Sequence, residues 1–228
     1  MGCKVLVVDL DGTLTLSRNT YELSVEALLA LRRARDAGIR VVLATANGLD
    51  FALTVARYLG VRDVIAENGC LVHIDGETHE LCSGDMSEVD RAVLATGAVA
   101  PSHQNKCRRF DLAYVPLVEN AVERVKAAVR PGYVVDSSGY AIHVRPAGAD
   151  KGAAVRWLCE RLGVSCGWVA AVGDSDVDAG MLATAWGIAV GNATEAAKRA
   201  ARAVVRGPSG LGFKEAVDLI LSGGACAP

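Results

Sequence analysis

Two carboxylates stand one residue apart at the end of an apolar run near the start of the chain. Asp9 and Asp11 follow the valine-rich stretch of KVLVVDLDGTLT, residues 4–15. Such a run is typical of a strand buried on both faces, and burying charge is unfavourable unless something offsets it. The two acids could hold a cation, attack phosphorus or move protons. Taken alone, the pair fits a solvated turn equally well.

Other polar residues follow further predicted strands or begin a predicted helix. They are Thr45, Lys151, Asp174, Asp176 and Asp178. The carboxyl ends of the strands in an open parallel sheet share one edge, and ligands bind outside that edge. We therefore expect these side chains to meet there, except Asp176, which we interpret as a residue of a helix N-terminus.

This set of residue types suits phosphoryl transfer. Carboxylates packed together repel one another, and a hard dication with oxygen ligands relieves the repulsion, for which Mg²⁺ fits best. The metal and the lysine would then offset the charge of an incoming phosphate. Asp9 could attack phosphorus, and Asp11 could protonate the leaving alcohol and later deprotonate water. Gly12 permits the sharp turn that such a loop needs.

The elements that carry these residues alternate between strand and helix. The first part of the chain predicts strands over 4–9, 39–45 and 63–68 and helices over 24–37 and about 49–59. The last part predicts a helix over 151–163, a strand over 168–174, a helix over 176–185, a strand over 187–191 and helices over 194–203 and 211–222. This alternation is the signature of a parallel sheet with helices on its faces.

The middle of the chain follows a different pattern. A D-G dipeptide within 70–81 predicts a hairpin, and it is followed by helices over about 85–96 and 117–130, a strand over 109–115 and a hairpin over 133–144. The fold class is therefore α/β. A Rossmann-like parallel-sheet core, residues 1–82 and 149–228, has helices on both faces, and a small α+β insert with an antiparallel sheet occupies residues 83–148.

Four motifs stand in order on the predicted strand ends and around the insert: DLDGT at 9–13, Thr45, Lys151 and GDSDVD at 173–178. Together they resemble the haloacid dehalogenase superfamily of phosphohydrolases, over about two-thirds of the chain. The insert lies between the second and third motifs and is similar to the α/β cap of the sugar-phosphatase-like branch, as is IAENGC at 65–70. The short length and compact cap look most like the archaeal-type phosphoglycolate phosphatases.

The resemblance implies a role for each matching residue. Asp9 would be the nucleophile and a metal ligand, and Asp11 would be the general acid/base, with its backbone carbonyl bound to the metal. Thr45 would donate a hydrogen bond to the phosphoryl group, and Lys151 would contact both the phosphate and Asp9. Asp174 would be a metal ligand, and Asp178 would be a further ligand or the partner of one. Two positions depart from the family pattern. Ala46-Asn47 stand where relatives usually carry Gly and then Arg or Asn, and Val177 stands where many carry Asn.

The implied function is a Mg²⁺-dependent phosphatase that forms an aspartyl-phosphate on a small metabolite, with 2-phosphoglycolate favoured. A sugar-phosphate or phosphoglycerate-type phosphatase and a phosphomutase stay open as alternatives. A non-enzymatic phospho-aspartate switch belongs to another class. Switches of that kind are shorter and have no cap, so the insert and the D-x-D spacing argue against it.

Some polar residues have two interpretations. His143 and Arg145 alternate with apolar residues, so one face of their strand is polar, and it could face the active site or solvent. Arg108 and Arg109 could bind a substrate carboxylate, although neighbouring arginines are more often ordinary surface residues. Asn192 follows another strand, and we expect a role in a turn.

Composition limits the partners and the compartment. The chain has 228 residues, is 51% hydrophobic and 22% charged, and has a net charge of −2, which gives no general attraction to nucleic acid or to an anionic membrane. We expect no nucleic-acid or membrane partner, a cytoplasmic location, and a monomer or homodimer. Seven cysteines without a C-x-x-C pair argue against zinc. An odd count usually means small buried apolar residues, and whether any of these cysteines form disulfides stays open, because spacing alone reveals no pairing.

Overall fold

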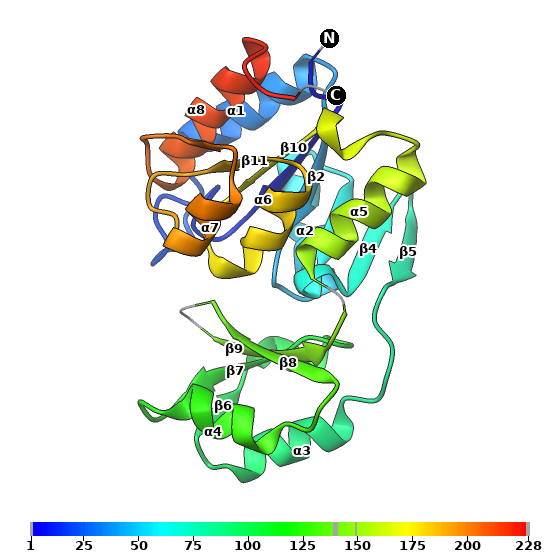
Figure 1. Cartoon of the computed structure of the whole chain (residues 1–228), viewed down its shortest axis with the longest axis vertical. Coiled ribbons are helices and arrows are strands. Elements are labelled where there is room, and N and C mark those ends of the chain that lie inside the picture. Colours follow the sequence, from blue (N-terminus) through cyan, green and yellow to red (C-terminus); the bar gives the residue numbers. More distant parts are fainter. Residues whose placement is uncertain (1, 139–140, 149, 227–228) are drawn as a thin grey trace.

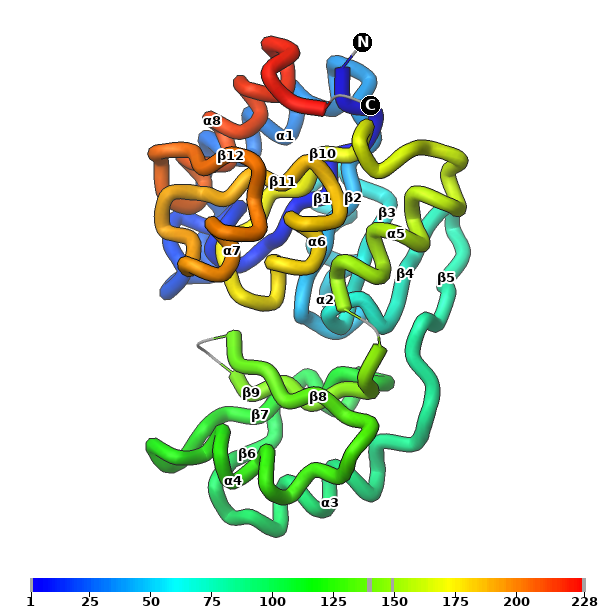
Figure 2. The backbone as a smooth tube through the Cα atoms, viewed as in Figure 1, coloured from blue at the N-terminus to red at the C-terminus, as the bar shows by residue number. Residues whose placement is uncertain are grey.

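The chain folds around two separate sheets in this computed structural model, which describes residues 2–138, 141–148 and 150–226. Figure 1 shows the larger sheet with its helices above and the smaller sheet below, and Figure 2 follows the chain from one to the other and back. The N- and C-terminal ends lie close together, at the end of the larger sheet that is farthest from the smaller sheet (Figure 1).

The larger sheet has eight strands in the order β12-β11-β10-β1-β2-β3-β4-β5. Its strands are β1 (Val5–Asp9), β2 (Arg40–Ala44), β3 (Asp63–Ala66), β4 (Leu71–Ile74), β5 (Glu77–Glu80), β10 (Val169–Gly173), β11 (Trp186–Ala189) and β12 (Ala203–Val204). The six strands from β12 to β3 are parallel, while β4 and β5 form the predicted antiparallel hairpin at one edge. All residues of the central β1 are buried, as its apolar sequence predicts.

Helices cover both faces of this sheet, as predicted. They are α1 (Val25–Asp36), α2 (Leu49–Leu59), α5 (Lys151–Leu162), α6 (Ala179–Thr184), α7 (Glu195–Ala200) and α8 (Ser209–Leu221), with short 3₁₀ turns η1 (Glu67–Gly69), η3 (Cys166–Trp168) and η4 (Asp176–Asp178). The pair α1 and α8 packs on one face, and α5, α6 and α7 lie on the other, in front of the strands in Figure 1. None of the helices in the described ranges is long and apolar enough to cross a membrane.

The smaller sheet lies within the insert and is fully antiparallel, in the order β6-β7-β9-β8. The elements of the insert are α3 (Ser87–Ala95), β6 (Val99–Pro101), η2 (His103–Lys106), β7 (Leu112–Pro116), α4 (Ala121–Ala128), β8 (Tyr133–Ser137) and β9 (Ile142–Pro146). They enclose a hydrophobic cluster of their own. Figure 1 shows α3 and α4 on the side of this sheet that faces away from the larger sheet.

Several element boundaries differ from the predictions. The strand predicted over 63–68 ends at Ala66, because Glu67 and Asn68 take left-handed backbone angles and begin η1. The helix predicted over 176–185 is split into η4 and α6, and the one over 194–203 ends at Ala200, after which β12 forms. The short β6 and η2 were not predicted, since three or four residues carry no periodic signal. The turn of the 133–144 hairpin contains residues 139–140, which lie outside the described residues.

The cysteines are mostly paired. Six of the seven are paired, in the disulfides Cys3–Cys226, Cys70–Cys82 and Cys159–Cys166, and Cys107 is free and exposed. The usual interpretation of an odd count, as small buried apolar residues, is therefore wrong for these six, and the open question of disulfides is answered. The first disulfide joins residues separated by 223 positions, because both chain ends lie at the same end of the larger sheet. Spacing along the sequence could not have revealed that pairing.

Candidate active site

Polar side chains from three neighbouring strands meet at the carboxyl edge of the larger sheet. Asp9 is the last residue of β1, Thr45 follows β2, and Asp174 follows β10. The exposed fractions of these residues are 5%, 1% and 0%, so none of them lies in a solvated turn. The smaller sheet lies beyond this edge (Figure 1). The strands bring these three residues together as the sequence predicts.

Lys151 links two of the carboxylates. Its ammonium Nζ donates hydrogen bonds of 2.6 Å to Asp9 Oδ1 and 2.6 Å to Asp178 Oδ1. The lysine is the first residue of α5 and is only 1% exposed. Burial by itself lowers a lysine pKa, but the charges of Asp178 and Asp9 outweigh it and raise the pKa of Lys151 above its usual value. Lys151 is therefore a buried cation and not a surface residue of the helix.

Asp178 holds the loop after β10 in place. Its Oδ2 accepts hydrogen bonds from the backbone N–H of Asp174 (3.1 Å) and Ser175 (2.9 Å) and from Ser175 Oγ (2.7 Å). Although burial raises a carboxyl pKa, Lys151 and the Ser175 hydrogen bonds hold the pKa of Asp178 below its usual range. Asp178 is thus an ionised anchor for Lys151 and for the loop that carries Asp174.

Three carboxylates form a group that suits a cation. Oxygens of Asp9, Asp174 and Asp178 all lie within 4.8 Å of one another. Asp174 Oδ1 is buried and has no hydrogen-bond partner in the described part of the chain. Burial and the charge of Asp178 raise the pKa of Asp174 to about 6, and burial likewise raises the pKa of Asp9. Crowded, hard oxygen donors with an unsatisfied atom fit a dication such as Mg²⁺.

Gly12 makes room for this group. Its φ of +92° lies in the left-handed region that favours glycine, and a Cβ there would lie 2.3 Å from Asp174 Oδ2. Any side chain at position 12 would displace the Asp174 carboxylate or the turn. The sequence predicts the turn, but the close approach to Asp174 is visible only in the structure.

Arg18 is a site residue that no motif in the sequence predicts. Its Nε donates to Asp174 Oδ2 (2.8 Å), and its Nη2 donates to that same oxygen and to the backbone carbonyl of Asp174 (2.7 Å). These bonds leave Asp174 Oδ1 as the free oxygen. Arg18 lies in the irregular segment between β1 and α1, where no periodicity or motif singles out one residue.

The Asp11 carboxyl lies apart from the three clustered carboxylates and is held by Asn47. The amide Nδ2 of Asn47 donates to Asp11 Oδ2 (2.8 Å) and to Thr45 Oγ1 (3.0 Å). Burial raises the pKa of Asp11, while the Asn47 hydrogen bond opposes that rise. In the sequence, Asn47 stands out only as part of Ala46-Asn47, the pair after Thr45 that departs from the family pattern. In the structure it connects Thr45 to Asp11.

A cavity of about 390 Å³ lies between the carboxylates and the insert. Its core side includes Asp9, Asp11 and Lys151, and its insert side includes Arg108 and His143. The cavity therefore places basic side chains of the insert opposite the carboxyl edge of the larger sheet.

The polar face of β9 is buried. His143 is 3% exposed and Arg145 is 5% exposed, so the interpretation of this face as solvated was wrong. His143 Nδ1 lies 3.2 Å from Asp111 Oδ1, and Arg145 Nη2 lies 2.6 Å from Asp136 Oδ2. His143 lines the cavity, whereas Arg145 pairs within the insert.

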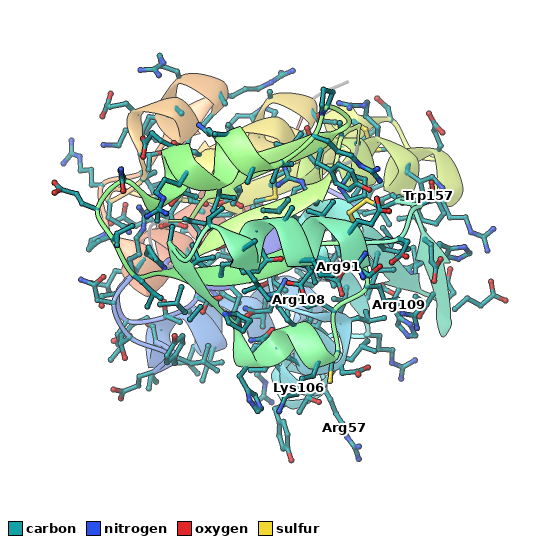
Figure 3. All side chains as sticks on the ribbon, turned by 90° about the horizontal axis from the view of Figure 1, so that it is seen from below. Arg57, Arg91, Lys106, Arg108, Arg109 and Trp157 are labelled. Carbon is teal, nitrogen blue, oxygen red and sulfur yellow. A yellow bond between two sulfur atoms is a disulfide. The ribbon has the colours of Figure 1, made fainter. Side chains whose placement is uncertain are left out.

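The two neighbouring arginines differ. Arg108 Nη1 donates to the backbone carbonyls of Ala46 (2.7 Å) and Asp111 (2.9 Å), and its buried Nε has no partner among the described residues. Arg109 is exposed and pairs with Glu80 at 2.5 Å. Figure 3, seen from the side of the insert, shows Arg108 near the middle of the molecule and Arg109 nearer its edge. The surface interpretation was wrong for Arg108 and is confirmed for Arg109.

The IAENGC segment joins the two sheets. The fully buried Glu67 carboxylate accepts hydrogen bonds from the backbone N–H groups of three consecutive insert residues, Arg109, Phe110 and Asp111, at 3.1, 2.8 and 3.1 Å. Asn68 Nδ2 donates to Asp111 Oδ2 at 2.6 Å. Residues before the insert thus hold the loop that carries Arg108 against the core.

Two further expectations concern residues beside the site. Asp176 is exposed at the start of η4, as expected for a residue of a helix N-terminus. Asn192 lies in the turn after β11, as expected, and its Oδ1 accepts a hydrogen bond from the backbone N–H of Ser209 (2.6 Å) at the start of α8.

Comparison with known proteins identifies the family. The model of the haloacid dehalogenase-like hydrolase family matches residues 6–91 and 113–209. The chain is 80% identical over 228 residues to a phosphoglycolate phosphatase of Pyrobaculum aerophilum, with 100% of both chains covered. It is 41% identical to a phosphoglycolate phosphatase of Metallosphaera sedula over 222 residues, which cover 96% of this chain and 99% of the relative.

Solved structures agree on the fold. A Thermoplasma acidophilum protein superposes with a TM-score of 0.86 at 22% identity, over 97% of this chain and 99% of the other. A haloacid dehalogenase-like hydrolase of Bacteroides thetaiotaomicron gives a TM-score of 0.80 at 22% identity, over 96% and 99%. Because the family model spans most of the chain, including all four motifs on the carboxyl edge, the chain belongs to the haloacid dehalogenase-like hydrolases.

Proposed function

We propose that this hydrolase is a phosphoric monoester hydrolase that converts 2-phosphoglycolate to glycolate and phosphate. The observation that carries the proposal is the buried Lys151, which bridges Asp9 and Asp178 beside the unpartnered Asp174 oxygen. Such an arrangement fixes a nucleophilic carboxylate next to a place for a cation and a phosphate. The names of the curated relatives support the same substrate.

The reaction would proceed in two steps through Asp9. Its carboxylate attacks phosphorus, the bond from phosphorus to the leaving oxygen breaks, and the Asp11 carboxyl gives that oxygen its proton. Asp11 then takes a proton from a water that attacks the aspartyl-phosphate, and phosphate leaves. The Lys151 ammonium contacts Asp9, and Thr45 follows the neighbouring strand at the same edge of the sheet, so both would donate to the phosphoryl oxygens there.

The metal would be Mg²⁺, held by Asp9, Asp174 and the backbone carbonyl of Asp11, with Asp178 as a ligand or as the partner of one. When bound, it would offset the charge of the phosphoryl oxygens and of the three carboxylates. The choice of Mg²⁺ follows from a donor set of oxygens alone.

The insert would select the substrate. We propose residues 1–82 and 149–228 as the catalytic core and residues 83–148 as a cap that covers the phosphate. Arg108 and His143 line the insert side of the cavity and would recognise the carboxylate of phosphoglycolate. A cavity of about 390 Å³ suits a small metabolite rather than a phosphoprotein. A monomer or homodimer in the cytoplasm fits this role, and disulfides occur in cytoplasmic proteins of hyperthermophiles.

A substrate panel tests the proposal. Phosphorylated metabolites of two to six carbons are assayed for phosphate release with Mg²⁺, using the wild type, Arg108→Gln and the surface control Arg109→Gln. We expect a steep preference for phosphoglycolate that Arg108→Gln removes and Arg109→Gln keeps. A flat profile or a preference for sugar phosphates contradicts the assignment. Isomerised hexose phosphate without free phosphate indicates a mutase, and a long-lived phosphoprotein without turnover indicates a switch.

A further inference from the structure

Gln104 is an insert residue whose side-chain amide forms hydrogen bonds with groups outside its own turn. It lies in η2, between β6 and β7. Its Oε1 accepts a hydrogen bond from the backbone N–H of Gly48 (3.0 Å), and its Nε2 donates to Asn47 Oδ1 (2.9 Å). Arg108 Nη2 also points at Oε1, at 3.4 Å. Both core partners belong to the loop between β2 and α2.

The orientation of both amides follows from groups that can only donate. The Gly48 N–H and the Arg108 guanidinium have no acceptor, so they require Oε1 of Gln104 on their side. That leaves Nε2 of Gln104 toward Asn47, which requires Oδ1 of Asn47 there. The Nδ2 of Asn47 must then face Asp11, to whose Oδ2 it donates at 2.8 Å. The assignment of each amide is fixed by the network rather than chosen freely.

We propose that Gln104 is a positioning residue that orients the Asp11 carboxyl through Asn47 only while the insert lies over the core. Gln104 belongs to the insert, and Asn47 and Asp11 belong to the core. If the insert moves away, Asn47 Oδ1 loses its donor, and the amide is held only through the contacts of its Nδ2 with Thr45 and Asp11. The donor to Asp11 Oδ2 is then less firmly oriented. Covering the substrate and aligning the acid/base are therefore one event. This inference rests on the role of Asp11 in the proposed function.

Two substitutions separate this role from simple packing. Gln104→Met keeps the length of the side chain but removes both hydrogen bonds. Gln104→Glu keeps an acceptor for Gly48 but replaces the donor, so Asn47 must turn its amide and present Oδ1 to Asp11. That oxygen repels the ionised Asp11 carboxylate and accepts the proton of the protonated one, which keeps this proton from the leaving oxygen. Arg109→Met is the matched control, because it breaks the insert–core ion pair with Glu80 without touching Asn47.

The readout is kcat/KM for phosphate esters that differ in their need for a proton. The alkoxide of an alkyl phosphate must be protonated as it leaves, whereas the phenolate of dinitrophenyl phosphate is stable without a proton. General acid catalysis contributes about 100- to 10,000-fold, so we expect both Gln104 variants to lose at least about 10-fold on the alkyl ester, with Gln104→Glu the more damaged. On the dinitrophenyl ester they should stay within about 3-fold of the wild type.

Asp11→Asn serves as the reference for a missing acid, and thermal unfolding checks that each variant is folded. If the Gln104 variants lose kcat/KM equally on both esters, Gln104 has only a structural role and the proposal is overturned. The proposal is also overturned if Gln104→Glu leaves kcat/KM for the alkyl ester unchanged. If Asp11→Asn itself shows no selective loss on the alkyl ester, the acid role in the proposed function and the inference both fall. A selective loss in Asp11→Asn without one in the Gln104 variants overturns the inference alone.

Discussion

Replacing Asp174 by Asn should stabilise the metal-free protein while it abolishes activity. Asp174 is fully buried next to Asp9 and Asp178, and one of its oxygens has no partner in the described residues. An asparagine keeps an oxygen for the Arg18 guanidinium, removes one negative charge and places an N–H₂ group among carboxylates. The variant therefore relieves the repulsion that a bound cation would otherwise offset.

The magnitude follows from the pKa of Asp174. A carboxyl whose pKa is higher in the folded than in the unfolded chain favours folding while it is protonated, and that contribution is lost as pH rises through the folded pKa. The pKa of Asp174 rises from 3.8 to about 6, so ionising it in the metal-free protein costs about 3 kcal/mol of stability at neutral pH. For a chain of this size, that corresponds to a shift in Tm of roughly 6–12 °C.

Thermal unfolding in EDTA measures this effect. At pH 8 we expect the Asp174→Asn variant to melt above the wild type, and at pH 4, where Asp174 is protonated, the difference should nearly disappear. Asp176→Asn is the control, because it removes a charge from an exposed residue two positions further along the chain. It should change the melting temperature little at either pH. A variant that melts below the wild type at pH 8, or that gains equally at both pH values, would refute the electrostatic reasoning.

The remaining predictions concern the ion pair, the metal and the disulfides. Lys151→Met should lower the free energy of unfolding by about 3–5 kcal/mol in a denaturant titration, because Asp9 and Asp178 lose their buried cation; an unchanged midpoint contradicts this. EDTA should stop phosphate release and Mg²⁺ restore it, whereas turnover that ignores chelation argues against the carboxylate group as a metal site. Cys3→Ser opens a loop of 223 residues and should cost about 5 kcal/mol of stability, while Cys107→Ser should cost little; equal effects would mean that the terminal disulfide contributes nothing.

The sequence predicts the core of the fold because its signals are strong and local. The apolar runs before Asp9, Thr45 and Asp174 predict strands, and α/β alternation predicts that these strands are parallel. Parallel strands share one carboxyl edge, so the strand order need not be known to bring the three side chains together. Lys151 is expected there because it opens the helix that returns from the insert.

Other site residues depend on tertiary contacts that leave no pattern along the chain. Arg18 lies in an irregular segment, and Gln104 lies in a four-residue turn, so neither has a periodicity that fixes its direction. The sequence alone shows that His143 and Arg108 are basic residues of the insert. Whether they face solvent or the cavity depends on how the insert lies on the core. Glu67 helps to fix that position through its hydrogen bonds to three backbone N–H groups of the insert.

The central claim is that the reaction passes through an acyl phosphate on Asp9. The measurement is acid quenching of the Asp11→Asn variant with Mg²⁺ and dinitrophenyl phosphate labelled at phosphorus, an ester that forms the intermediate without an acid although its hydrolysis still needs the base. Label on the protein is counted in one sample, and a second sample is reduced with borohydride for peptide mass spectrometry. We predict that label is retained on the protein and that residue 9 alone is converted to homoserine. Turnover by the wild type with no trapped label, or label on any residue other than Asp9, would contradict the account.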